Sequence, residues 1–116
     1  MNIEFEPRGR VSVVFINGSV DSQTAEIVLS ELTAHVDAGH LQLVADLDGV
    51  DYTSSAGLRA LLSTVKATRR GGGDLRLARV HPNVLKVLEL SGFTTILKLY
   101  DELDAAVASF ESPAAA

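Results

Sequence analysis

The feature that most constrains this fold is the alternation of two kinds of segment along the chain. Five segments are rich in β-branched or alternating apolar residues, which predicts strands: residues 2–6, 11–16, 41–47, 74–80 and 94–100. Four others carry apolar residues at helical spacing: they lie within residues 20–40, 56–70, 81–92 and 101–110. The resulting order, β-β-α-β-α-β-α-β-α, is typical of the α/β class. We therefore expect one mixed, mainly parallel β-sheet of about five strands, with about four helices packed on it.

Local signals refine the first half of this prediction. The first two strands are expected to pair as a hairpin through residues 7–9. Asp21 or Ser22 can cap the first helix, and Leu29 is expected on its apolar face.

Length and composition favour a single domain. The chain has 116 residues, of which 47% are hydrophobic and 22% charged, as in ordinary globular proteins. We predict one domain over residues 1–111 and a flexible C-terminal tail over residues 112–116. The absence of cysteine excludes disulfides and cysteine-ligated zinc sites. The formal net charge of -5 argues against nucleic-acid binding, which needs clustered Lys and Arg.

The distribution of apolar residues argues against a membrane protein. The longest apolar runs are shorter than the roughly 20 residues that a membrane-spanning helix needs. The opening segment, MNIEFEPRGR, lacks the apolar stretch of a secretory signal peptide. We expect a soluble, cytoplasmic protein with no membrane partner.

Three loops that each precede a predicted helix are candidates for a functional site: residues 18–22, 48–55 and 81–83. In open α/β sheets, ligands bind beyond the carboxyl ends of the strands, where such loops meet. The middle loop runs into YTSSAGLRALL, residues 52–62, where Ser54 or Ser55 can cap the next helix. Gly57 falls in the first turn of that helix, where glycine costs roughly 1 kcal/mol against alanine. Such a glycine suggests that another backbone or a ligand approaches closely.

A serine at the start of a helix can also carry a phosphate. Free N–H groups and the helix dipole favour negative charge at this end. A phosphate adds about -1.5 to -2 charges, which would repel a partner docked on the same surface. A serine that is both a phosphate acceptor and part of an interface would therefore act as a switch.

The segment DLDGVDYTSSAGLRALL, residues 46–62, resembles the signature of STAS domains, and especially of bacterial anti-sigma factor antagonists. INGSVDSQTAEIVLSEL and GGGDLRLARVHPNVLKVLELSGF resemble further segments of the same family, so the resemblance covers nearly the whole chain. It implies that Ser55 is the phosphorylated residue. Gly57 and Leu58 match the glycine and leucine of the family pattern. Ser54 stands where the family usually has an aspartate, and Arg59 replaces a second glycine.

The resemblance also implies a partner-binding surface around this serine. Asp21 matches the acidic residue of the first strand-to-helix turn, which lies near the serine in the family. The expected partner-binding residues are Asp21, Asp51, Thr53, Ser54, Gly57, Leu58 and Arg59.

The function that the resemblance implies is partner switching. The unphosphorylated protein would bind an anti-sigma factor of the histidine-kinase-like ATPase type and so free a sigma factor. That kinase would then phosphorylate Ser55 and dissociate, and a metal-dependent serine phosphatase would reset the cycle. The chain would be a substrate and a ligand rather than an enzyme, with no catalytic residue, metal or cofactor of its own.

Four other interpretations remain open. A serine hydrolase is disfavoured, because Thr53 stands where the Gly-x-Ser-x-Gly elbow needs glycine. Weak nucleotide binding at the serine edge is a second. Asp46, Asp48 and Asp51 are close in sequence, but the glutamate that closes a calcium loop is absent, so solvated loop acids are the default. A non-switching STAS adaptor subunit of a transporter or signalling complex would need no phosphate on Ser55.

Overall fold

Five strands lie side by side in one sheet, in the order in which the chain forms them. The computed structural model describes residues 1–111. The strands are β1 (Asn2–Arg8), β2 (Val11–Asn17), β3 (Gln42–Gly49), β4 (Asp74–Ala78) and β5 (Lys98–Tyr100). β1 runs antiparallel to β2, and each of the other neighbouring pairs is parallel. The predicted mixed, mainly parallel sheet is therefore confirmed.

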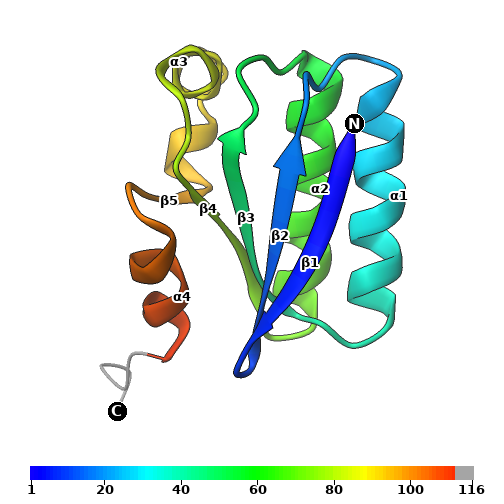
Figure 1. The fold of residues 1–116 in the computed structure, drawn as a ribbon, viewed down its shortest axis with the longest axis vertical. Helices are drawn as coiled ribbons and strands as arrows, with labels where there is room; N and C mark the ends of the chain where they lie inside the picture. Colours follow the sequence, from blue (N-terminus) through cyan, green and yellow to red (C-terminus); the bar gives the residue numbers. More distant parts are fainter. Residues whose placement is uncertain (112–116) are drawn as a thin grey trace.

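Helices cover both faces of the sheet (Figure 1). They are α1 (Thr24–Asp37), α2 (Ser55–Arg70), α3 (Pro82–Leu90) and α4 (Leu103–Glu111), with a short 3-10 turn, η1 (Phe93–Thr95). α1 and α2 lie side by side on one face, whereas α4 packs on the other. Within residues 1–111, no helix combines the length and the apolar character that crossing a membrane requires.

The alternation of side chains along each strand divides the core in two. Val14 and Ile16 of β2 point toward α1, α2 and α3, where they join the larger cluster of buried side chains. Val11, Val13 and Val44 point the other way and pack against α4. Because the sheet is buried on both faces over its central strands, these strands read as nearly continuous apolar runs.

The hairpin turn lies further along the chain than predicted. Arg8 pairs with Val11, so Gly9 and Arg10 form the turn, and Pro7 pairs with Ser12 inside β1. Proline has no N–H to donate to a ladder, but β1 is an edge strand and tolerates it. Gly9 adopts a φ of 64°, which suits glycine and explains why the turn centres there.

The last strand is much shorter than the predicted residues 94–100. Gly92 ends α3 with a φ of 76°, and the N–H groups of Ile96 and Leu97 donate to the Phe93 carbonyl. The β-branched residues of this segment therefore form the η1 turn, and only residues 98–100 pair with β4. The prediction was wrong because local backbone bonds at the helix end outweighed β-propensity.

The apolar face of α1 is narrower than predicted. Ala25, Val28 and Leu32 are buried, but Leu29 keeps 37% of its surface exposed. Leu29 lies at the margin of the buried stripe, beside α2, so it contributes little to the apolar face on which it was expected. The tail predicted over residues 112–116 lies outside the described residues.

Candidate functional site

The loops that follow β2 and β3 are joined at the carboxyl edge of the sheet. The Val20 N–H donates to the Tyr52 carbonyl at 3.0 Å, and the Ser54 N–H donates to the Val20 carbonyl at 2.8 Å. Val20 and Thr53 consequently form an isolated parallel bridge. This bridge extends the pairing of β2 and β3 and fixes the backbone immediately before α2.

The loop that follows β4 reaches the same edge. Nε2 of His81 is hydrogen-bonded to the backbone carbonyl of Asp48, and it lies 3.8 Å from a carboxylate oxygen of the same residue. The prediction that three loops meet at one edge of the sheet is confirmed.

Asp21 organises the start of α1. Its Oδ1 accepts hydrogen bonds from the N–H groups of Gln23 and Thr24, at 2.9 and 2.8 Å. The Asp21 N–H donates in turn to the Thr24 hydroxyl. The hydrogen bonds to its carboxylate, led by that of the Thr24 N–H and followed by those of the Thr24 hydroxyl and the Gln23 N–H, lower the pKa of Asp21 below its usual value of 3.8. Gln23 occupies the N-cap position of α1, but its side chain forms no capping bond. Of the two predicted capping residues, Asp21 is the one whose side chain accepts N–H groups at the start of the helix, and it presents an exposed negative charge at the site.

The two serines at the start of α2 have different environments. Ser54 is extended, with φ -88° and ψ 172°, and its hydroxyl accepts a hydrogen bond from the Gly57 N–H at 3.3 Å. Ser54 is thus the N-cap, which resolves the choice that the sequence left open. Ser55 is the first residue of the helix, and it is exposed.

Gly57 is buried against the bridged loops. A Cβ at this position would overlap with Oγ1 of Thr53 and would lie 2.7 Å from Cγ1 of Val20. The close approach inferred from the sequence is therefore made by the protein's own loops. Thr53 and Leu58 are also buried, at 6% and 2% exposure. In this conformation the three predicted partner-binding residues Thr53, Gly57 and Leu58 support the loop from beneath rather than forming its surface.

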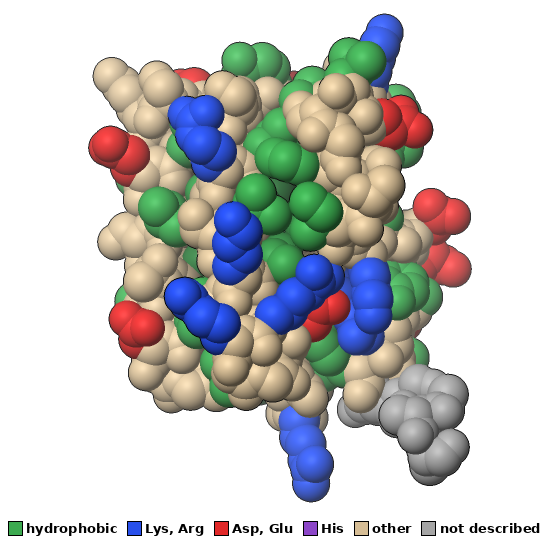
Figure 2. Space-filling model, turned by 180° about the vertical axis from the view of Figure 1, so that it is seen from behind, with side chains coloured by type: hydrophobic (Ala, Val, Ile, Leu, Met, Phe, Trp, Pro, Cys, Tyr) green, Lys and Arg blue, Asp and Glu red, His purple; other side chains and the backbone are tan. Residues whose placement is uncertain are grey.

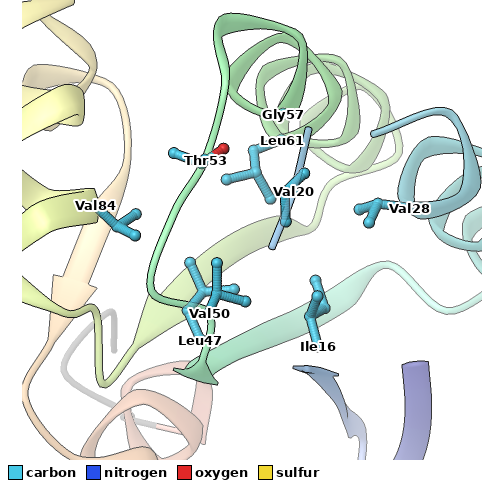
Figure 3. Close-up of a pocket in the computed structure, with 9 residues that line it drawn as sticks. All are labelled: Ile16, Val20, Val28, Leu47, Val50, Thr53, Gly57, Leu61 and Val84. Carbon is cyan, nitrogen blue, oxygen red and sulfur yellow. The ribbon is translucent and has the colours of Figure 1, made fainter. Parts of the chain in front are cut away.

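A small, largely apolar cavity lies under this loop (Figure 3). It has room for about one water molecule. Its lining comes from α1, α2, α3, two strands and the bridged loops: Ile16, Val20, Val28, Leu47, Val50, Thr53, Gly57, Leu61 and Val84. Because ligand pockets typically enclose about 300–1,000 Å³, a cavity with room for about one water is core space rather than a binding pocket.

The exposed part of the site consists of loop and helix side chains around Ser55. Asp51 and Arg59 are exposed, and Tyr52 keeps 53% of its surface exposed. Tyr52 was not among the residues predicted from the sequence. The available signal was an aromatic residue within a polar loop, between the predicted site residues Asp51 and Thr53.

A groove between α1 and α2 begins beside this exposed surface. It is lined by Ser22, Ala25, Glu26, Leu29, Ala56, Arg59, Ala60 and Ser63. Figure 2 shows the side of the molecule that these helices cover, with Lys and Arg side chains spread along it. α2 itself carries four basic residues and no acidic one, although the chain as a whole is acidic.

Comparison with protein-family models matches residues 2–106 to the STAS domain. The chain belongs to the STAS domain family. Among the relatives, BtrV of Bordetella bronchiseptica, named as a candidate anti-sigma factor antagonist, is 40% identical over 100 residues, covering 86% of each chain.

Solved structures of similar fold include an anti-sigma factor antagonist from Mycobacterium paratuberculosis. It is 27% identical, with a TM-score of 0.87, and the match covers 96% of this chain and 94% of that one. Unphosphorylated SpoIIAA, also an anti-sigma factor antagonist, has a TM-score of 0.82 at 17% identity, covering 95% and 96% of the two chains. The last likeness concerns the fold alone.

In this STAS domain a second polar network supports the site from the residue that follows β4. The guanidinium of Arg79 binds Oδ2 of the buried Asp46 through two donors, at 2.7 and 3.0 Å. The Asp48 N–H donates to the other oxygen of Asp46 at 2.9 Å. Asp46 is therefore committed to an ion pair. Within residues 1–111, no group of three or more His, Cys, Asp or Glu side chains is placed to hold a metal ion.

Proposed function

We propose that this STAS domain is an anti-sigma factor antagonist that acts by partner switching through Ser55. The observation that carries the proposal is the division of roles at the start of α2, where Ser54 caps the helix and Ser55 remains exposed. The 40% identity to BtrV, named as a candidate anti-sigma factor antagonist, supports the same function. The protein would act in the cytoplasm, in the regulation of transcription.

In its unphosphorylated form the protein binds an anti-sigma factor of the histidine-kinase-like ATPase type, which frees the sigma factor. Asp51 and Tyr52 in the loop before α2, and Arg59 one turn after Ser55, are exposed and supply an aromatic contact and both signs of charge. Aromatic and arginine side chains are the usual energetic centres of protein interfaces. We expect Asp21 and Ser54 to lie within the same interface.

The kinase transfers the γ-phosphoryl group of ATP to Oγ of Ser55, with ADP as the leaving group, and the hydroxyl proton passes to a base of the kinase. The phosphate places about -1.5 to -2 charges in the centre of the interface. The complex then separates, because keeping the interface closed would require removing water from the phosphate or holding the partner directly against its charge. A metal-dependent serine phosphatase hydrolyses the phosphoester, which releases inorganic phosphate. The STAS domain is a substrate throughout and supplies no catalytic group.

Phosphate mapping tests the proposal. The purified protein is incubated with ATP and, in turn, each histidine-kinase-like anti-sigma factor of the source genome, and the modified residue is located by mass spectrometry. We expect phosphate on Ser55 in the wild type and in Ser54→Ala, and none in Ser55→Ala. The absence of phosphate at Ser55 with every kinase would contradict partner switching and would favour a non-switching adaptor.

A binding measurement tests the charge mechanism separately. Ser55→Asp should weaken binding to the kinase that modifies Ser55, because it places a negative charge at the same position. Ser55→Asn is the matched neutral control and should bind more tightly than Ser55→Asp. Equal affinities of the two variants at physiological salt would show that charge is not what separates the complex.

A further inference from the structure

Ser55 and Arg59 lie one helical turn apart on α2. Residues at positions i and i+4 of a helix are neighbours on one face, with about 5–6 Å between their Cβ atoms. Both side chains are exposed, and Arg59 forms no ion pair with any residue within 1–111. The guanidinium of Arg59 is therefore free to meet a group attached to Ser55.

Part of the backbone at the start of α2 is already hydrogen-bonded, so a side-chain donor can add contacts to a phosphate on Ser55. The Gly57 N–H is occupied by the Ser54 hydroxyl at 3.3 Å, and the Leu58 N–H donates to the Ser54 carbonyl at 3.2 Å. Two amides of the first turn are thus already bonded within the protein. A phosphate on Ser55 has three acceptor oxygens, and a guanidinium can bind two of them in parallel.

The surrounding charges leave Arg59 available for this role. α2 contains no Asp or Glu, so no acidic residue on the same helix competes for Arg59. Glu26 shares the α1–α2 groove with Arg59 but forms no ion pair with it. The nearby Asp21 is engaged by the N–H groups at the start of α1.

We propose that Arg59 binds the phosphate of phosphorylated Ser55 and holds it against α2. This inference rests on the proposed function, since it concerns the phosphorylated state of the same serine. Arg59 is then a positioning residue with opposite roles in the two states. It presents a positive charge to the partner before phosphorylation and is neutralised by the phosphate afterwards. One modification thereby adds a negative charge to the interface and withdraws a positive one.

The test uses protein with phosphoserine incorporated at position 55 during translation, so that no kinase is needed. The second pKa of the phosphate is measured by ³¹P NMR titration in the wild type and in Arg59→Gln. We expect this pKa to be lower in the wild type by about 0.3 units or more, because the guanidinium favours the dianion. Lys66→Gln is the matched control. It removes the same charge from the same helix, two turns further from Ser55, and should leave the phosphate pKa near its wild-type value.

Thermal unfolding provides a second readout. Phosphoserine should raise the Tm of the wild type more than that of Arg59→Gln, whereas Lys66→Gln should behave as the wild type. Equal phosphate pKa values in the wild type and Arg59→Gln would overturn the proposal, and so would an equal effect of Lys66→Gln. Either result would leave open whether a kinase modifies Ser55, so the failure of this inference is distinguishable from that of the proposed function.

Discussion

The Ser54 hydroxyl accepts a hydrogen bond from the Gly57 N–H at 3.3 Å, and this contact separates the roles of two adjacent serines. The extended backbone of Ser54 turns its side chain back over the first helical turn. Ser55 has entered the helix, so its hydroxyl is free for modification. A phosphate at position 55 can therefore be added without removing the cap of α2.

The first prediction concerns the cap. Ser54→Ala should lower the free energy of unfolding by about 1 kcal/mol, because the Gly57 N–H loses its acceptor. Ser55→Ala should change it by less than about 0.5 kcal/mol, since Ser55 is exposed. Ser54→Asp should retain most of the stability, because aspartate caps equally well. Urea unfolding at pH 7 measures all three, and equal losses in the two alanine variants would contradict the assigned cap.

The second prediction concerns Gly57. Gly57→Ala should destabilise the protein by about 1–3 kcal/mol, because its Cβ would overlap with Oγ1 of Thr53. Combining it with Thr53→Ala should recover part of that loss, and the two changes should be coupled by at least about 0.5 kcal/mol. A double-mutant cycle by chemical denaturation measures this coupling. Strict additivity would mean that the packing against Thr53 is not why position 57 needs glycine.

The third prediction concerns Tyr52. Tyr52→Ala should weaken binding to the kinase that modifies Ser55 by about tenfold or more, as expected for an exposed aromatic anchor. Its Tm should stay close to the wild-type value, because the ring is not part of the core. Isothermal titration calorimetry checks the affinity. The matched control is Ile27→Ala on α1, also an exposed apolar residue, at 49%. If Ile27→Ala weakened binding as much as Tyr52→Ala, the anchor assignment would be wrong.

The order of elements and the location of the site could be predicted because both depend on local patterns. Strand and helix periodicities differ, and loops that precede helices in a parallel sheet meet at one edge. A close approach at Gly57 could be predicted, but not what approaches it, since its neighbour Val20 belongs to a distant loop that only the fold brings near. Likewise, the burial of Thr53 follows from its bridge to Val20, which no local pattern shows.

At the segment before α4 the prediction failed for the opposite reason, because local hydrogen bonds outweighed a strand-like sequence pattern. The segment after Gly92 has the composition of a strand, but the bonds of Ile96 and Leu97 to the Phe93 carbonyl close a 3-10 turn. Arg79 was also missed as a support of the site. Its ion pair joins the loop after β4 to β3, and nothing in the sequence near Arg79 indicates Asp46 as its partner.

The fourth prediction concerns backbone strain at Arg79. Within residues 1–111 this is the only residue other than glycine with a positive φ, at 53°. Arg79→Gly and Arg79→Ala both remove the ion pair to buried Asp46, so both should lose at least about 1 kcal/mol of stability. Arg79→Gly should nevertheless be the more stable variant by about 1 kcal/mol, because glycine adopts this φ without steric cost. Chemical denaturation measures the difference, and a more stable Arg79→Ala would argue against strain at this position.

The fifth prediction concerns the pH dependence of stability at the end of α1. The ring of His35 stacks between Phe5 and His40, with centroid distances of 3.9 Å to each, and its Nε2 is hydrogen-bonded to the Ser12 hydroxyl at 2.7 Å. Burial, and secondarily the charge of His40, lowers the pKa of His35 below its usual 6.5.

A histidine whose pKa is lowered by folding binds its proton more tightly in the unfolded chain. Its contribution to stability is therefore complete above pH 6.5 and is lost as the pH falls through the pKa of the folded state. The Tm should decline as the pH falls below about 6.5, and His35→Gln should reduce that decline. His81→Gln, which removes a histidine at the opposite edge of the sheet, should leave the decline largely intact. Scanning calorimetry across this range provides the measurement, and parallel profiles for the wild type and His35→Gln would show that His35 does not cause the loss.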